Sequence, residues 1–472
     1  MNPPAQRTMR EAGEADQDAP GGWRWAIGLT ILFLVLVWPA ILAGGGGTSQ
    51  ANDMVDYHAI EIRRLAAQWP TPDLRESFTT TTPGFHLVLA VVAKLGGGLV
   101  VQRLVASLAG WLAWLVTWRM AAAWCSARVA AVLAAPVALS PYLLGATVWM
   151  TTDAAALALA AATMGVALVA RNEVRMSRVA GLLGAGTVLV RQIMLWASVP
   201  AALRVLFDRA KGVQASWGAR AWRLAVVLVP PVACVAAFFA MWGGSMPPRF
   251  QPFHQAVFNP AAMVMLLATL GCWGVLVLPG AWMVLDRRAR VRCVLVAVMA
   301  MAMCAAVRSD WRKVLPPDEM RRGTVTEHTW GPTAPDVVKG AGEVGRWGGP
   351  IWEVARALPA PSGRSVSMIV LAGLGVVVAA ALRERAARVG HAWPATLLLA
   401  ALLCMGLAQC LNAQTFQRYF DPWALLAVGW LVAMGQGVDS RSDRWCVRGA
   451  ALLAVLQFGM SAVVVFKPAL AG

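Results

Sequence analysis

Acidic and imidazole side chains stand close together in the segment 53–58, which reads DMVDYH and follows the first long apolar run of the chain. A carboxylate held at the mouth of a site can act as a general base on a hydroxyl group. Asp53 or Asp56 is predicted to do this, although an Asp at the start of a short helix often only caps it. His58 is predicted either to orient that carboxylate, to bind substrate or to make ordinary loop hydrogen bonds.

Two arginines much further along the chain are candidates for binding an anion. Arg191 interrupts an apolar stretch, and a charge buried in a membrane is costly and usually functional. Arg418 is the second candidate, although an Arg close to a span end often only snorkels to the interface. Fixed cations of this kind stabilise the charge that grows on a departing phosphate. His254 is a further candidate for the same phosphate, with an ordinary loop role as the alternative.

Four other polar side chains are predicted to contact substrate. Thr82 ends a run of Thr residues that either offers hydroxyls to a substrate or simply closes a turn. Asp153 begins a predicted helix, so a plain N-cap is an equally good interpretation. The other two are Gln192 and Tyr419, which directly follow the two arginines. The acidic residues show no recognisable metal-ligand spacing and arginines alone can bind a monophosphate, so no cofactor is predicted, with a divalent metal left open.

The composition places these residues in a membrane protein. Of the 472 residues, 58% are hydrophobic and 14% are charged, whereas a soluble domain has about a quarter charged residues. The formal charge of +17 comes from 41 basic against 24 acidic residues. The basic residues recur in short clusters between apolar runs instead of forming one patch, which argues against a nucleic-acid partner. They indicate cytoplasmic loops.

About thirteen membrane-spanning helices are predicted between these clusters, so the expected fold is all-α and polytopic. The predicted spans are 25–43, 99–122, 128–148, 153–170, 178–190, 192–206, 222–242, 261–285, 293–308, 365–382, 392–411, 421–437 and 447–466. The two that flank Arg191 are too short to cross a hydrocarbon layer of about 30 Å, so they are predicted to be half-helices that meet at a polar break. Residues 85–98 are predicted to form a juxtamembrane helix, because counting them as a span would disturb the charge alternation.

The predicted topology gathers the polar segments on the face opposite the arginine clusters. The expected parts are a cytoplasmic tail (1–24), an N-terminal transmembrane module (25–308) with its first loop (44–98), an extracytoplasmic loop (309–364) and C-terminal helices (365–472). The 309–364 loop is longer than an idle connection usually is, so it is expected to cover the site. Basicity that comes mostly from Arg, together with many Ala, hints at a GC-rich bacterial source.

Several function classes lack their sequence signals. The eight Cys residues lie in or beside apolar runs without a close CxxC pair or a His companion, so neither a zinc site nor a disulfide framework is indicated. The chain has no P-loop, no GxGxxG after a strand, no GxSxG and no HExxH, which weighs against a nucleotide-driven pump and against the corresponding proteases.

A family resemblance rests on several landmarks that occur in order along nearly the whole chain. They are Asp53–His58, the Thr-Thr-Pro-Gly turn at Thr81–Gly84, Thr152-Asp153, Arg191-Gln192 followed by Trp196, a Gly loop from Trp242 to His254, and Arg418-Tyr419-Phe420 with Pro422. With these landmarks the chain resembles the GT-C superfamily of integral membrane glycosyltransferases, which take sugars from polyprenyl-phosphate carriers. Within that superfamily it is most similar to the eukaryotic α-1,2-glucosyltransferases that add the final glucose to the dolichol-linked oligosaccharide.

The resemblance implies a GT-C-like fold and an inverting hexosyltransferase of a bacterial inner membrane, with its active site facing the periplasm. Its partners would be membrane lipid, a polyprenyl-phosphate-sugar donor (glucose-like) and a glycan or lipid-linked acceptor. Asp53 or Asp56 would be the base, while Arg191, Arg418 and His254 would bind the donor phosphate. Two Trp residues are candidates for stacking on sugar rings: Trp196 and Trp347.

The chain also departs from the family pattern. The family usually has adjacent Asp-Glu four and three residues before the His, whereas here Asp53 and Asp56 lie five and two residues before His58. Which aspartate is the base is therefore left open. Gln417 stands where an acidic residue often precedes Arg-Tyr-Phe, so a different acceptor is compatible with the pattern. The alternatives are a lipid or solute transporter or flippase, and a non-catalytic scaffold of the same fold.

Overall fold

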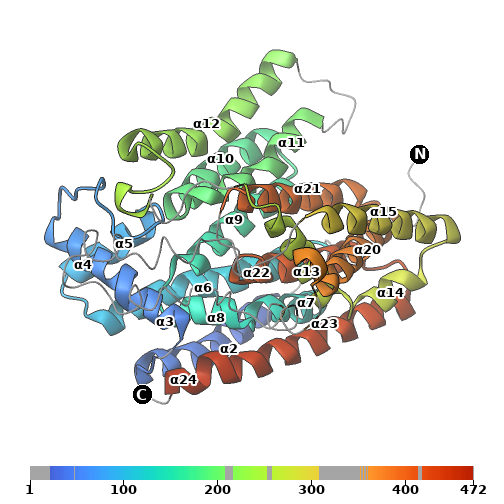
Figure 1. The fold of residues 1–472 in the computed structure, drawn as a ribbon, viewed down its shortest axis with the longest axis horizontal. Helices are drawn as coiled ribbons and strands as arrows, with labels where there is room; N and C mark the ends of the chain where they lie inside the picture. Colours follow the sequence, from blue (N-terminus) through green and yellow to red (C-terminus); the bar gives the residue numbers. More distant parts are fainter. Residues whose placement is uncertain are drawn as a thin grey trace.

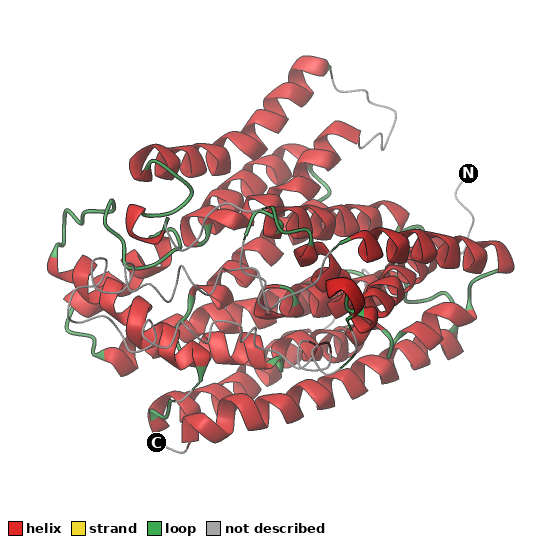
Figure 2. Cartoon of the chain, viewed as in Figure 1, coloured by secondary structure: helices red, strands yellow, loops and turns green. Residues whose placement is uncertain are grey.

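The computed structural model describes residues 22–46, 48–207, 216–251, 258–307, 351, 355, 358, 360–412 and 417–470. Across these ranges the regular structure is helical and no strand occurs (Figure 2). The predicted all-α class is confirmed. His254, Trp347 and most of the 309–364 loop lie outside the described ranges, as do residues 1–21 of the tail.

In the described part of the chain, eight helices are long and apolar enough to cross a membrane. They are α2 (Gly22–Ala43), α6 (Leu99–Ala121), α9 (Thr152–Val169), α12 (Trp217–Trp242), α15 (Arg287–Ala306), α20 (Val366–Arg388, with the preceding turn η6, Pro361–Gly363), α21 (Ala392–Gln409) and α23 (Ser440–Ser461, continued by η8, Ala462–Phe466, and α24, Lys467–Leu470). A ninth span results if α7 (Ala127–Ala138) and α8 (Pro141–Val148), bent by 71°, count as one. The chain is thus a multi-pass membrane protein.

The predicted count of about thirteen spans is not confirmed, because several predicted spans consist of short helices. The region predicted as one span at 261–285 forms α13 (Ala261–Gly274) and α14 (Leu278–Met283). The helix α22 (Asp421–Met434) has only 14 residues, which corresponds to about 21 Å of helix. Between α7 and α8, Pro141 has no N–H for the helical ladder, so α8 begins anew with Ser140 as its N-cap.

The predicted break at Arg191 is confirmed. The helix α10 (Glu173–Val190) ends there, because Arg191 has an extended backbone with φ −158° and ψ 108°. A 3-10 helix, η2 (Gln192–Ser198), and α11 (Val199–Phe207) follow. The break leaves the Arg191 side chain at a helix end, where polar groups accumulate.

The first loop is itself largely helical. After α2 it forms α3 (Ser49–Asp53), a π-helical turn η1 (Met54–His58), α4 (Ala59–Ala67) and α5 (Gly84–Lys94). The helix α5 has 11 residues, which is about 16 Å and too short to span, so it matches the expected juxtamembrane helix. Figure 1 shows α3, α4 and α5 together at one end of the helix bundle, whereas α14 and the start of α23 lie at the other end.

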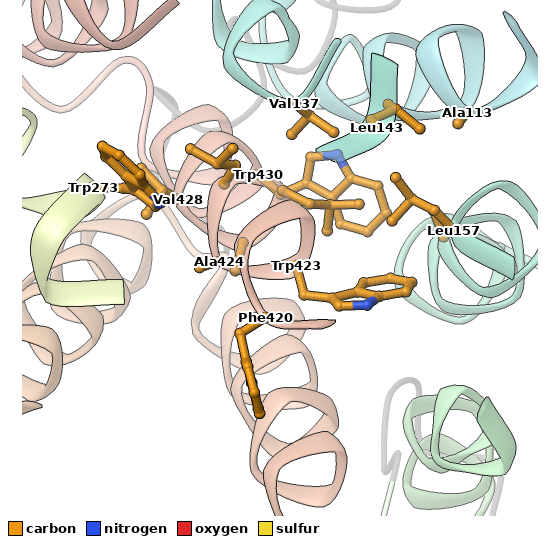
Figure 3. Packing of buried hydrophobic residues seen from close by; sticks show 14 of the residues in the cluster. Ala113, Val137, Leu143, Leu157, Trp273, Phe420, Trp423, Ala424, Val428 and Trp430 are labelled. Atoms are coloured by element: carbon orange, nitrogen blue, oxygen red, sulfur yellow. The ribbon is translucent and has the colours of Figure 1, made fainter. Parts of the chain in front are cut away.

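The core holds α22, which follows Arg418 and Tyr419, and α9, which carries Asp153. Trp423 and Trp430 of α22 are 3% and 0% exposed, and Leu157 of α9 is 2% exposed. Figure 3 shows these side chains beside one another, and the Trp430 indole N–H donates to the Thr117 carbonyl of α6 at 3.1 Å. The helix α22 is thereby held against α6, with Leu157 of α9 beside its tryptophans.

Candidate active site

An ion pair joins the first loop to the start of α22. Arg418 lies in a 3-10 turn, η7 (Gln417–Tyr419), and its Nη1 donates to Asp53 Oδ2 at 2.5 Å. The two side chains are 19% and 29% exposed. Burial disfavours the charge on Arg418, but the charges and hydrogen bonds of Asp53 and Tyr419 together outweigh burial and raise the pKa of the guanidinium. The residues are 365 positions apart, so only the fold brings them together.

A second ion pair joins Asp153 to Arg191. The Nη1 of Arg191 contacts Oδ1 of Asp153, and the two side chains are 13% and 22% exposed. The N-cap of α9 is Thr151, and Asp153 stands in the first helical turn. The plain N-cap interpretation of Asp153 is therefore wrong, because its carboxylate is turned toward Arg191.

Tyr419 links the two ion pairs into one cluster. Its ring centroid is 4.9 Å from Cζ of Arg191 and 5.4 Å from Cζ of Arg418, both within cation–π range. We call the five residues the Arg–Asp cluster: Asp53, Arg418, Tyr419, Arg191 and Asp153. The structure thus brings together groups from the first loop, two helix starts and the helix break, while their chemical roles stay predictions.

The π-helical turn η1 places Tyr57 where the charges of both candidate bases act on it. Burial raises the pKa of Tyr57 to about 12, and the charges of Asp53 and Asp56 add to the shift. The phenol therefore stays protonated at neutral pH. A π-helical turn inside a helix often marks a functional site. Asp56 is half-buried in this turn, and of the two aspartates Asp53 is the one held by Arg418.

His58 pairs with a histidine that sequence reasoning did not select. Its Nδ1 lies 2.8 Å from Nε2 of His86 in α5, and both rings are buried. Burial lowers the pKa of His58 well below its usual value, and His86, Arg418 and Arg191 lower it further. Burial also lowers the pKa of His86 to about 4, with Glu61 opposing the shift. Both rings are neutral at pH 7, so one donates to the other, which fits the structural interpretation of His58.

Glu61 anchors the first loop from inside. Its side chain is fully buried and accepts two hydrogen bonds from Arg64, at 2.9 and 2.8 Å, and one from the Phe78 N–H at 3.1 Å. Arg64 is a local partner at a spacing of three residues, whereas Phe78 is 17 residues away and could not be identified as a partner from the sequence.

Thr82 and Gln192 fasten the Thr-rich turn to the helix break. The Thr82 hydroxyl donates to the Val188 carbonyl at 2.5 Å, and the Thr82 N–H donates to Gln192 Oε1 at 3.1 Å. Gln192 Nε2 donates to the carbonyls of Thr80, at 2.7 Å, and Ser245, at 3.1 Å. Because Thr82 is fully buried with its hydroxyl engaged, the geometry favours the turn-closing alternative over a substrate contact.

Trp196 is buried in the core. Its ring is 4% exposed and meets Trp423 edge-on, with centroids 4.9 Å apart and planes at 85°. Its indole therefore packs η2 against α22. Because the ring is buried, Trp196 does not present the surface for sugar stacking that the sequence had suggested. Within the described ranges, no group of three or more His, Cys, Asp or Glu residues is arranged to hold a metal ion.

Known proteins show little similarity to this chain. No protein-family model matches the chain, and no curated protein matches it. One solved structure, ArnT from Cupriavidus metallidurans in the apo state, aligns with 92% of this chain and 78% of its own, at 15% sequence identity and a TM-score of 0.36. A similarity of this size does not indicate an activity, so the function has to be inferred from the side chains of the site.

Proposed function

We propose that the chain is a membrane glycosyltransferase of the GT-C type. It transfers a hexose from a polyprenyl-phosphate donor to a glycan or lipid-linked acceptor, with inversion at the anomeric carbon, on the periplasmic face. One observation carries this proposal: two arginines from distant segments share the Tyr419 ring, with Asp53 in contact with one of them.

The two arginines suit a lipid phosphate. Guanidinium groups present planar forks that match phosphate oxygens, and they keep their charge in a partly buried site. Arg191 and Arg418 are only 13% and 19% exposed, so their attraction to an anion is screened less than at an open surface. Charge that develops on the phosphate as it leaves would be stabilised here.

The aspartates of the first loop suit the base. In the proposed step, an acceptor hydroxyl oxygen bonds to the anomeric carbon while the bond from that carbon to the phosphate oxygen breaks. The hydroxyl proton passes to Asp53 or Asp56, and polyprenyl phosphate leaves. Attack opposite the departing oxygen inverts the anomeric centre. Asp53 is engaged by Arg418 whereas Asp56 lies three residues further along the same loop, so both aspartates need testing.

The place of the cluster suits a lipid-borne donor. The helix α2, which leads into α3, has only 22% of its apolar window buried, so it offers a lipid-facing surface next to Asp53. The last turns of α6 and α20 carry Arg119, Arg385 and Arg388. Basic residues at the ends of membrane-spanning helices indicate the cytoplasmic side. The Arg–Asp cluster, at the other end of these helices, would therefore face the periplasm.

The test is a transfer assay with the purified protein in lipid nanodiscs and a panel of radiolabelled polyprenyl-phosphate sugars. We expect one donor to be used, with loss of activity in the Asp53→Asn/Asp56→Asn double variant of about 10²- to 10⁴-fold, the usual contribution of a general base. The single variants identify the base. Glu173→Gln is the matched control, because Glu173 forms an ion pair with Arg223 at the opposite end of α10.

Unchanged transfer by the double variant would contradict the proposal. Movement of labelled lipid across the bilayer without sugar transfer would instead support the carrier alternative. The broken helix at Arg191 is compatible with that alternative too, since discontinuous helices also occur in transporters.

A further inference from the structure

Each of the two arginines assigned to the lipid phosphate already holds a carboxylate in this structure. Arg418 pairs with Asp53, and Arg191 pairs with Asp153. Asp53 has a proposed role as a base, whereas the proposed reaction gives Asp153 no proton to move. A partly exposed carboxylate that contacts a phosphate-binding arginine must compete with the phosphate for the same donors.

We propose that Asp153 is a release residue, which competes with the phosphate group for Arg191 and so drives the polyprenyl phosphate product out of the site. This inference rests on the proposed function. It names a role for Asp153 beyond the substrate contact expected from the sequence.

The charges of donor and product explain why release needs such a residue. The donor phosphate is a diester with one negative charge. Breaking its bond to the sugar leaves a monoester, whose second pKa is about 6 and whose charge at pH 7 is about −1.5 to −2. Two guanidinium groups therefore attract the product more strongly than the donor. Without a competing anion, the product would remain bound and the enzyme would be inhibited by it.

The position of Asp153 lets its carboxylate leave Arg191 and return. It is the second residue of α9, an 18-residue helix, and its other oxygen lies 3.5 Å from the Thr151 hydroxyl. The N–H groups at the start of a helix and the helix dipole stabilise a carboxylate in this turn. When a phosphate occupies Arg191, Asp153 keeps the Thr151 hydroxyl and its favourable place at the start of the helix dipole, so its displacement costs little.

Arg191 is equally suited to exchange its partner. The Tyr419 ring lies 4.9 Å from its Cζ and holds the guanidinium plane by a cation–π contact. The fork itself points to Asp153. A phosphate can thus replace the carboxylate without loss of the aromatic contact. The side chain is 13% exposed, so the exchange does not require a fully buried ion to be uncovered.

The experiment measures binding of radiolabelled short-chain polyprenyl phosphate to the full-length protein in nanodiscs, with the uncharged polyprenol as the reference ligand. For Asp153→Asn we expect the Kd for polyprenyl phosphate to fall about tenfold, the factor that corresponds to one charge-assisted hydrogen bond. In turnover assays the variant should show stronger product inhibition, and kcat over many turnovers should fall by a larger factor than the rate of a single turnover. Glu173→Gln should change none of these quantities.

Asp153→Ser is the second variant, so that the result does not depend on the folding of the Asn variant alone. An equal or weaker affinity for polyprenyl phosphate in both variants, with normal melting temperatures, would overturn the release role alone. If the wild-type protein binds polyprenyl phosphate no better than polyprenol, the proposed function fails as well, so the two failures are distinguishable.

Discussion

The chain contains Arg–Asp ion pairs at both ends of the helix bundle, and they differ in how deeply the arginine is buried. At the end that holds α14, Arg385 is fully buried, and its three nitrogens donate to Ser442 Oγ at 3.3 Å, to the Val432 carbonyl at 3.2 Å and to Asp443. The other oxygen of Asp443 accepts from the Gly437 N–H at 2.9 Å. This pair ties α20, α22 and α23 together.

The pairs of the Arg–Asp cluster are looser. Arg191 and Arg418 are 13% and 19% exposed, and their aspartates are 22% and 29% exposed, whereas the Arg385 side chain is 0% exposed. Each of these two arginines also contacts the Tyr419 ring. Under the proposed function, the same residue types form a structural pair at one end and exchangeable pairs at the other. The burial of the arginine side chain distinguishes the two cases.

The largest stability effect is expected at the structural pair. Arg385→Ala should lower the free energy of unfolding by about 3–5 kcal/mol, because Asp443 would be left without its cation. Thermal unfolding in detergent measures this. Arg292→Ala is the control, since its pair with Glu384 spans 3.5 Å with Arg292 66% exposed, and such pairs contribute about 0–1 kcal/mol. Equal melting temperatures of the two variants would remove the distinction between the two ends.

The largest activity effect short of removing the base is expected at the exchangeable pairs. Arg191→Lys keeps the charge but loses the planar fork, so kcat/KM should fall about 100-fold while the melting temperature stays close to that of the wild-type protein. Arg223→Lys is the control, because it pairs with Glu173 at the far end of α10. A large drop in stability with normal kcat/KM would make Arg191 a structural residue like Arg385.

A smaller effect is expected from pH through the His58–His86 pair. Burial lowers the pKa of His86 to about 4 in the folded protein, whereas an unfolded His has a pKa of about 6.5. The unfolded state therefore binds more protons between these values. Stability should be complete above pH 6.5 and fall by up to about 3 kcal/mol as the pH drops to 4. In His86→Gln this part of the pH dependence should be missing from melting curves. A variant with the wild-type slope would show that the pair does not control it.

The smallest effect is expected at the Thr-rich turn. Thr82→Val removes the hydroxyl that donates to the Val188 carbonyl and should cost about 1–3 kcal/mol of stability. Because this hydroxyl is fully buried, the KM for the donor should change by less than about threefold, roughly 0.6 kcal/mol. Steady-state kinetics beside a melting curve separates the two quantities. A large rise in KM at unchanged stability would restore the predicted substrate contact.

Local sequence features predicted much of the exchangeable end. Arg191 stands out because it interrupts an apolar run, and the extended backbone at this residue confirms the helix break. The segment 53–58 stands out because it is polar and follows the first span. In both cases the signal is a polar residue or segment inside or directly after an apolar run, which a single sequence can show.

Pairings between distant segments could not be predicted. His86 lies 28 residues from His58, and Asp443 lies 58 residues from Arg385, so no local pattern relates them. From the sequence, Arg385 is only one of several basic residues at the end of an apolar run. The number of spans was overestimated for a related reason. Composition shows that 261–285 is apolar, but the break between α13 and α14 depends on packing.

The most direct test of the exchangeable end is the binding of a lipid phosphate to Arg191 and Arg418. Binding of radiolabelled polyprenyl phosphate and of polyprenol should be compared in the wild-type protein and in the Arg191→Gln/Arg418→Gln double variant. Melting curves should first establish that both proteins are folded. We predict that the wild-type protein prefers the phosphate at least about 100-fold, which corresponds to about 2.7 kcal/mol, and that the double variant loses this preference. An undiminished preference in the double variant would contradict phosphate binding by the Arg–Asp cluster.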